Sequence, residues 1–324
     1  MTSVEASVRG EAAEAVHDHG LPSFVVCPAC HSALSDGAAE FICMGCGTAY
    51  PRSNGQPDLR LRRKIKRTVH YSPDPTGASK LIDEIPVDPA GAGEFLSDLR
   101  STPELSYGNR LSAPLVSHFP CASRDGEKML DLGCGDRNFE KICRQVTGFD
   151  YLGVDYDGDK PDMLADAHAL PFSDSAFAFV LSVAVLEHLA FPDIAVSEAF
   201  RVLQPGGMFI GTVAFLEPFH MNSHYHMTHL GLQAVLSRAG FDVVAIAPNH
   251  DWSGSRAQAE MALYPGMPTR LQQAVAAAPN WISRMCWAAK RQLKGTTEAS
   301  DLLRVARNAG GFRFVARRPA TAVN

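Results

Sequence analysis

The chain has 324 residues, of which 46% are hydrophobic and 20% are charged, and its formal net charge at pH 7 is −5. A chain of this length exceeds one typical domain and can bury a sizeable core. The acidic balance disfavours a broad nucleic-acid-binding surface, which needs excess positive charge. The first 20 residues lack the apolar centre of a secretory signal, and no stretch approaches 18 consecutive apolar residues. These features predict a globular, cytoplasmic protein without a membrane span.

Two Cys-x-x-Cys pairs, separated by 12 residues, lie near the N-terminus. Residues 1–22 are expected to be a flexible tail, and residues 23–58 to form a small zinc ribbon. The expected metal ligands are Cys27, Cys30, Cys43 and Cys46. Two such pairs supply the four thiolates of a tetrahedral zinc site, and a site closed by four protein ligands is structural. Two redox-active pairs are the alternative, which is disfavoured because no thioredoxin-like βαβ pattern surrounds them.

Residues 59–105 are expected to be a linker that is first basic and then rich in Pro and Gly. Six of the eight residues in 60–67 are Lys or Arg. Such a run could contact RNA or an anionic membrane surface, although basic runs are more often solvated linkers.

The most informative stretch is 129–136, where an apolar strand precedes two glycines and a helix-like segment. Gly133 and Gly135 permit positive φ and let a ligand lie against the backbone. Asp155 follows Gly135 by 20 residues, the spacing at which a carboxylate reaches a ribose hydroxyl in a doubly wound nucleoside-binding fold. A dinucleotide fingerprint has a third glycine where this chain has Asn138. The stretch therefore predicts a nucleoside ligand without phosphates, with an ordinary strand-to-helix turn as the alternative.

Four motifs in order make residues 107–247 resemble a class I S-adenosylmethionine-dependent methyltransferase of the UbiE-like type (methyltransferase type 11). They are the glycine stretch and the segments 165–172, 177–189 and 198–207. The resemblance implies S-adenosylmethionine as the cofactor. The cofactor-binding residues that it implies are Asp131, Gly133, Cys134, Gly135, Asp155, Tyr156, Asp166, Ala167 and Ser182. Arg137 departs from the family, which often has a small residue there, so the resemblance does not say how the methionine carboxylate is held.

Alternating apolar strands and helices across this region predict an α/β fold with a doubly wound, mostly parallel sheet. Strands are expected near 128–132, 151–155, 162–165, 177–182, 207–213 and 242–247, and helices near 138–146, 193–203 and 228–239. By resemblance, the alternating segment 312–317 is the antiparallel seventh strand of a Rossmann-like methyltransferase sheet. The methyltransferase core is therefore assigned to residues 106–247 and 312–318.

The segment 248–311, between the sixth and seventh strands, is expected to be a helical insertion near the acceptor site. The sixth strand ends at the carboxyl edge of the sheet, where ligands bind in open α/β folds. Trp281, Ile282 and Met285, next to Arg284 and Lys290, indicate an amphipathic helix with a basic side. A helix packed on the core, a lid and a partner surface all fit this pattern.

Methyl transfer from a sulfonium is an in-line displacement, so positioning of the reactants can supply most of the rate enhancement. A general base is needed only when the acceptor must lose a proton. The expected catalytic candidates are His220, His188 and Glu187, which follow the fourth and fifth strands. His220 belongs to a histidine-rich segment, 217–229, whose spacing fits no metal-ligand motif. The alternative for each histidine is a loop residue with hydrogen bonds of its own.

Three functions are consistent with these patterns. The leading hypothesis is O- or N-methylation of a small-molecule or glycan-pathway acceptor. The second is RNA base methylation, because some bacterial ribosomal guanine methyltransferases also carry a four-cysteine ribbon, although the acidic charge disfavours an RNA partner. The third is a catalytically silent binding or scaffold protein that keeps the fold. Every cofactor motif lies beyond residue 106, so the ribbon is expected to be dispensable for cofactor binding. The sequence does not define the oligomeric state.

Overall fold

The computed structural model describes residues 21–63, 65–66, 111–218, 223–249, 252–263, 266–295 and 307–320. The expectations for the first 20 residues, for most of the linker and for His220 lie outside these ranges. Within the described ranges, no helix combines the length and apolar content that a membrane span requires.

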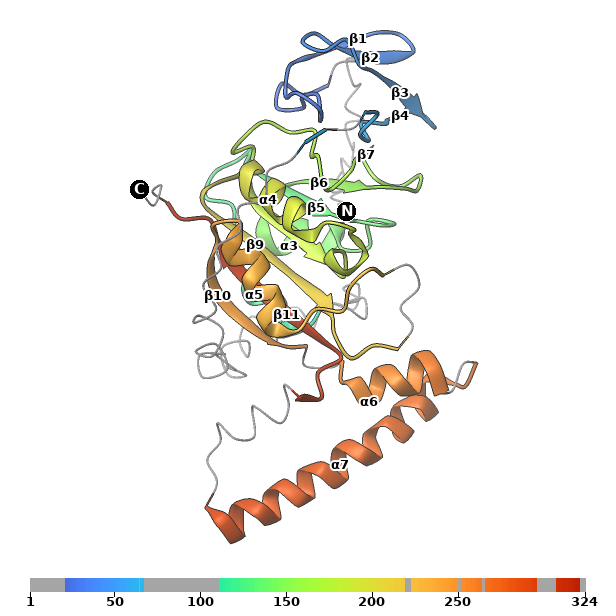
Figure 1. Ribbon diagram of the computed structural model, residues 1–324, viewed down its shortest axis with the longest axis vertical. Coiled ribbons are helices and arrows are strands. Elements are labelled where there is room, and N and C mark those ends of the chain that lie inside the picture. Colours follow the sequence, from blue (N-terminus) through green and yellow to red (C-terminus); the bar gives the residue numbers. More distant parts are fainter. Residues whose placement is uncertain are drawn as a thin grey trace, which may run out of the picture.

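A seven-stranded sheet lies at the centre of the molecule (Figure 1). Its strands are β5 (Lys128–Leu132), β6 (Asp150–Asp155), β7 (Met163–Leu164), β8 (Phe177–Val183), β9 (Leu203–Ala214), β10 (Asp242–Pro248) and β11 (Gly311–Arg317). The strand order is β10-β11-β9-β8-β5-β6-β7. All pairs among β5 to β9 are parallel, whereas β11 is antiparallel to both of its neighbours. The predicted mostly parallel, Rossmann-like methyltransferase sheet is confirmed.

Helices cover both faces of this sheet. They are α2 (Ala113–Val116), α3 (Glu140–Thr147), the 3-10 helix η2 (Leu186–His188), α4 (Pro192–Val202) and α5 (His229–Arg238). One apolar cluster contains side chains of α4 and α5, and the other contains side chains of α2 and α3. Successive strand residues point to opposite faces, so Val180 joins the first cluster while Phe179 and Leu181 join the second. Burial on both faces explains why these strands have continuous apolar runs.

Element boundaries differ from the expected ones where local backbone geometry intervenes. β9 begins at Leu203, directly after α4, and the expected Pro-Gly-Gly turn is an irregularity inside the strand, where Gly206 has φ 82°. α3 ends at Gly148, which adopts the left-handed conformation that glycine tolerates best. α5 begins after Thr228, whose hydroxyl accepts a hydrogen bond from the Gly231 amide at 3.1 Å.

The N-terminal ribbon forms a second, antiparallel sheet. Its strands are β1 (Leu34–Asp36), β2 (Glu40–Cys43), β3 (Ala49–Ser53) and β4 (Gln56–Pro57). The ribbon also joins the large sheet, because the Leu59 amide donates to the Leu164 carbonyl of β7 at 2.8 Å and Val25 bridges to Phe172. Tyr50 and Leu59 are fully buried in the same apolar cluster as Phe172. The ribbon and the large sheet therefore share one core.

Three helical elements lie between β10 and β11. They are α6 (Gly254–Ala257), the π-helical segment η3 (Gln258–Leu263) and α7 (Thr269–Lys294). Just before α6, the Trp252 indole donates to Oε1 of Glu217 at 2.6 Å, which ties this segment to the loop after β9. In Figure 1, α7 lies at the opposite end of the molecule from the ribbon.

Candidate functional site

The loop after β5 has the backbone geometry expected for ligand binding. Gly133 and Gly135 have φ values of 75° and 53°, which disfavour side chains. A Cβ on Gly133 would lie 2.3 Å from Cγ2 of Val185, whereas a Cβ on Gly135 would meet nothing within 4 Å. Gly133 is therefore required by packing, and Gly135 leaves open space beside its backbone.

Asp155, at the end of β6, holds this glycine loop. Its Oδ2 accepts a hydrogen bond from the Gly135 amide at 2.8 Å, and its Oδ1 accepts one from the Tyr156 amide at 2.7 Å. Each carboxylate oxygen can accept a second hydrogen bond, so the group can also receive ribose hydroxyls. The neighbouring Tyr156 is 61% exposed, which leaves its ring accessible.

Three of the expected cofactor residues are buried beneath the accessible surface. Asp131 is 1% exposed and accepts a hydrogen bond from the Tyr151 hydroxyl at 2.6 Å. Burial raises the pKa of Asp131 to about 7. Cys134 is also buried, and Ser182 is completely buried within β8. The structure thus buries these three side chains, and direct contact with a cofactor stays a prediction.

Asp166 is connected to the start of α4 through His168. His168 Nδ1 lies 2.7 Å from Oδ1 of Asp166, and His168 Nε2 accepts a hydrogen bond from the Phe191 amide at 3.2 Å. The proton of a neutral ring must therefore be on Nδ1, where it is donated to Asp166. Burial alone would raise the pKa of Asp166, but the hydrogen bonds from His168 outweigh it and hold the pKa below its usual range. Ala167 lies between them and is 8% exposed.

Arg137, the departure from the family pattern, fastens α3 to β6. It adopts a left-handed conformation with φ 59°. Its guanidinium forms ion pairs with Glu140, at 2.8 Å, and with Asp162. Oδ2 of Asp162 in turn accepts a hydrogen bond from the Gly153 amide at 2.8 Å. The role of this arginine depends on partners 3 and 25 residues away, which no local motif indicates.

The two catalytic candidates in the described residues, Glu187 and His188, differ in burial. Glu187 is fully buried, and its Oε1 accepts a hydrogen bond from the Ala214 amide at 3.2 Å. Its carbonyl accepts from the amides of His224 and Tyr225 at 2.7 and 3.0 Å. Glu187 therefore joins the ends of β8 and β9, and His188 lies beside it, half-buried, in η2.

Ala184 is a site residue that sequence reasoning missed. It has φ 55°, a strained conformation for a residue with a side chain. Its amide donates to the Thr212 carbonyl at 3.0 Å, which holds this conformation. The next residue, Val185, packs against Gly133. No periodicity or composition signal marks such a position.

A hollow of about 470 Å³ lies between the N-terminal end of α4 and the length of α5. Its walls are mainly apolar and include Phe191, Ile194, Tyr225, Met227, Val235 and Arg238. Its volume is in the range of small-molecule sites. Phe191 connects it through His168 to Asp166, so the hollow adjoins the expected cofactor site.

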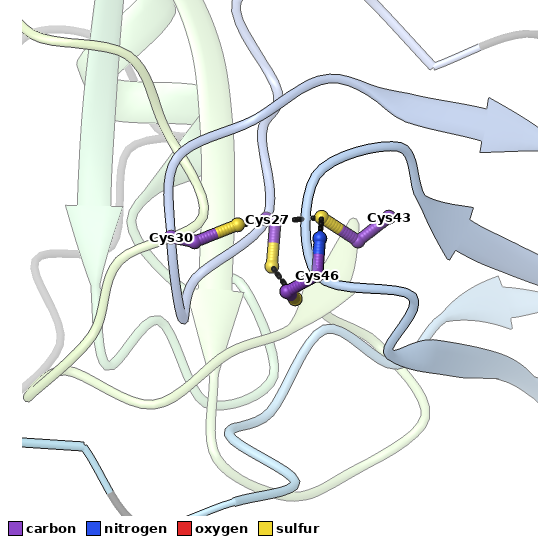
Figure 2. A group of neighbouring side chains, drawn as sticks. All are labelled: Cys27, Cys30, Cys43 and Cys46. Atoms are coloured by element: carbon purple, nitrogen blue, oxygen red, sulfur yellow. Dashed lines mark hydrogen bonds between the residues drawn. The ribbon is translucent and has the colours of Figure 1, made fainter.

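The four ribbon cysteines converge on one point, as Figure 2 shows. All four sulfur atoms lie within 4.8 Å of one another, with Cys27 and Cys46 at 3.8 Å and Cys30 and Cys43 at 3.4 Å. A tetrahedral zinc ion with bonds of about 2.3 Å separates its sulfur ligands by about 3.8 Å. A Cβ on Gly45 would lie 2.2 Å from the Ser32 hydroxyl, so the second pair requires glycine here. The cluster fits a structural zinc ion.

The thiols of this cluster differ in acidity. The Thr48 hydroxyl lowers the pKa of Cys46 to about 6, whereas burial raises the pKa of Cys43 to about 12. A metal ion removes this difference, because zinc binds each cysteine as a thiolate.

The ribbon also contacts the expected cofactor loop. The guanidinium of Arg60 donates to the Tyr156 carbonyl at 3.1 Å and lies over the Tyr156 ring at 5.4 Å. Asp58, which is 2% exposed, holds Arg60 at 2.6 Å and Arg62 at 2.5 Å. Burial alone would raise the pKa of Asp58, but the two arginines outweigh it and hold the pKa below its usual range. These contacts link the ribbon to the loop, and whether cofactor binding needs the ribbon stays a prediction.

Arg60→Ala is expected to weaken S-adenosylmethionine binding about two- to tenfold. It removes one hydrogen bond and one cation–π contact to Tyr156, together worth about 1–2 kcal/mol at a partly exposed site, and only part of this loss reaches the cofactor because Arg60 acts on it through Tyr156. Arg62→Ala is the matched control, because it removes an ion pair with Asp58 without touching Tyr156. Titration calorimetry on both variants checks the link, which equal affinities for the two would contradict.

The sheet order, the glycine loop and Asp155 together are those of the Rossmann-like methyltransferase fold. Residues 130–211 match the family model described as "Methyltransferase domain". This match over residues 130–211 agrees with the resemblance to S-adenosylmethionine-dependent methyltransferases seen in the motifs.

Curated relatives share about a third of their aligned residues with this chain. A probable S-adenosylmethionine-dependent methyltransferase of Mycolicibacterium smegmatis is 31% identical over 38% of this chain and 54% of its own length. The human Probable tRNA methyltransferase 9B is 31% identical over 35% of this chain and 26% of its own length. The 27-O-demethylrifamycin SV methyltransferase of Amycolatopsis mediterranei is 32% identical over 30% and 42%. The chain therefore spans between a quarter and about half of these relatives.

Among solved structures, the chain aligns with the [4+2]-cyclase SpnF at 20% identity, over 64% of this chain and 80% of the other, with a TM-score of 0.41. It aligns with a Haloferax volcanii complex of the Trm112 methyltransferase activator and a methyltransferase at 17% identity, over 65% and 89%, with a TM-score of 0.42.

Proposed function

We propose that this protein transfers the methyl group of S-adenosylmethionine to an oxygen or nitrogen of a small-molecule or glycan-pathway acceptor. The observation that carries the proposal is the open face of Gly135, held by Asp155 at the carboxyl edge of the sheet. Ligands of open α/β folds bind at this edge. The neighbouring hollow of about 470 Å³ is large enough for a small acceptor.

The residues that fit the cofactor belong to three loops. In this proposal the backbone at Gly135 contacts the ligand, Asp155 accepts the ribose hydroxyls, and Tyr156 and Asp166 flank the adenine. Asp131, Gly133, Cys134, Ala167 and Ser182 shape this site from beneath. The cofactor, when bound, supplies an electrophilic methyl group on its sulfonium. The protein then acts mainly by positioning the acceptor, because near-attack geometry can provide about 7–11 kcal/mol.

The acceptor side of the proposed site lies beyond the ends of β8 and β9. We propose that the apolar body of the acceptor occupies the hollow between α4 and α5, against Phe191 and Tyr225. His220 and His188 stay the proposed bases for an acceptor that loses a proton. Glu187 is proposed as a positioning residue, because its carboxylate and carbonyl hold the segments after β8 and β9 together.

We propose that a structural zinc ion is bound by Cys27, Cys30, Cys43 and Cys46. The sulfur separations support this assignment, and four thiolate ligands leave no position for catalysis.

RNA methylation is the second candidate, because three curated relatives are named "Probable tRNA methyltransferase 9B". The ion pairs of the arginines at the end of the ribbon argue against RNA methylation. Arg60 and Arg62, which begin the basic run 60–67, are both paired with the buried Asp58. Two of the cations expected to contact phosphates are therefore already engaged within the protein.

Release of S-adenosylhomocysteine in the presence of candidate acceptors tests the proposed function. Turnover is expected with hydroxyl- or amine-bearing small molecules or glycan precursors, and none with tRNA.

Once an acceptor is found, His220→Ala and His188→Ala should each lower kcat by about 10²–10⁴-fold if the acceptor must lose a proton, without changing cofactor affinity. His224→Ala is the control, because His224 is exposed. Turnover with tRNA alone would support RNA methylation, and cofactor binding without any turnover would support the scaffold hypothesis.

A further inference from the structure

α7 exposes an apolar face that nothing in the described structure covers. The helix has 26 residues, which corresponds to a length of about 39 Å. Five of its large apolar side chains are strongly exposed: Leu271 50%, Trp281 62%, Ile282 55%, Met285 54% and Leu293 83%. At 100° per residue, these five side chains fall within an arc of about 120°. An arc of this width is the face that a helix normally buries.

The opposite face of α7 is basic. Arg270, Arg284, Lys290 and Arg291 fall within the opposite arc of about 160°, which also contains the half-buried Trp287. The sequence contains no Asp or Glu from position 261 to 297. A segment with a charge of +5 thus stands out in a chain whose net charge is −5.

α7 is attached to the protein by its N-terminal half and by its polar side. It packs against α6 and η3, and Gln272, which lies on the polar arc, is 8% exposed. This attachment directs the apolar arc away from the protein. In Figure 1 the helix extends along the outer end of the molecule.

We propose that α7 lies on an anionic lipid surface, with its apolar arc inserted between the headgroups. A helix of this composition, with Trp, Ile and Leu on one face and Lys and Arg on the other, matches the pattern of interfacial helices. Arg270 and Lys290 flank the apolar arc on its two sides, where long cationic side chains reach the headgroups while their stems contact apolar surface.

Charge argues for lipid over a second copy of this chain. If two α7 helices paired through their apolar arcs, the flanking cations of both copies would approach one another without an acidic partner on either helix. Like charges in such positions destabilise pairing. An anionic bilayer satisfies the apolar arc and the cations at the same time. This proposal concerns the surface of α7 and does not depend on the proposed methyl transfer.

Flotation of the full-length protein with lipid vesicles tests the proposal. The protein is expected to bind vesicles that contain phosphatidylglycerol at least about tenfold more strongly than vesicles of pure phosphatidylcholine, and added salt should weaken the binding. Met285→Asp should lower the affinity for the anionic vesicles about tenfold or more. The matched control is Gln273→Asp, an exposed position on the basic face with the same change in charge. Each of Arg284→Gln and Lys290→Gln should lower the affinity about fivefold.

Two results would overturn the proposal. The first is a loss of vesicle selectivity, seen either as equal binding to neutral and anionic vesicles or as equal affinity loss in Met285→Asp and Gln273→Asp. The second is a concentration-dependent dimer in size-exclusion chromatography that Met285→Asp abolishes, because the apolar arc would then belong to a second copy. All four substituted side chains are exposed, and circular dichroism verifies that each variant keeps its helical content.

Discussion

Removal of zinc is expected to destabilise the whole protein, including the methyltransferase sheet. Structural zinc contributes on the order of 10 kcal/mol or more to the folding of zinc-finger peptides, which is comparable to the entire stability of a typical domain. Tyr50 and Leu59 of the ribbon are buried in the same core as Phe172 and Phe177 of the large sheet. Loss of the ribbon fold therefore removes apolar contacts from both parts. We expect one thermal transition with zinc, shifted to a lower temperature by a chelator, rather than separate melting of the ribbon.

Metal analysis and calorimetry check this result. One zinc ion per chain should copurify, and Cys43→Ser should reproduce the effect of the chelator. Cys121→Ser is the control, because Cys121 is exposed and lies outside the four-cysteine cluster. Two independent transitions, or a melting temperature that the chelator does not change, would show that the two parts fold separately.

Asp155→Ala is expected to weaken S-adenosylmethionine binding by about 1–3 kcal/mol, or roughly 5- to 150-fold. Two losses add in this variant. The ribose hydroxyls lose a charged acceptor, and the amides of Gly135 and Tyr156 lose the carboxylate that fixes the loop. Asp155→Asn separates these losses, because it keeps one acceptor oxygen but removes the charge. Its affinity should fall between those of the wild type and the alanine variant.

Asp157→Ala is the matched control for this experiment. Asp157 lies two residues away, is exposed, and accepts a hydrogen bond from the Gly158 amide. The variant loses the same charge but leaves the contacts of the glycine loop intact. If calorimetry gave the same affinity for Asp155→Ala and Asp157→Ala, Asp155 would have no specific part in cofactor binding.

The sequence was sufficient to predict the sheet, the glycine turn after β5 and the convergence of the four cysteines, because their signals are local. Strands buried on both faces have continuous apolar runs, and β5, β6 and β8 lie within about a residue of the expected positions. Gly133 and Gly135 reveal a turn that excludes side chains, and the spacing of the four cysteines reveals their convergence. Each of these constraints acts between residues that are close in the chain or follow a regular period.

Contacts between distant segments were not predictable in the same way. Arg60 contacts Tyr156 across 96 residues, and Leu59 pairs with Leu164 through backbone atoms that every residue possesses. Backbone pairing leaves no signature in side-chain composition. For that reason the ribbon was expected to be dispensable and Leu59 was assigned to a linker, whereas the structure buries Leu59 completely.

The pairing of Leu59 with β7 also has a consequence for the solubility of the protein. β7 is the last strand at its side of the sheet, and an exposed edge strand offers free amides and carbonyls to any other extended chain. Asp58 and Leu59 occupy part of this edge, and Val25 occupies the neighbouring segment at Phe172. A protein shortened to begin after residue 62 would expose these backbone groups together with the apolar side chains beneath the ribbon. Such a fragment is expected to aggregate as it is produced, so residues 21–62 protect the large sheet from association with a second copy.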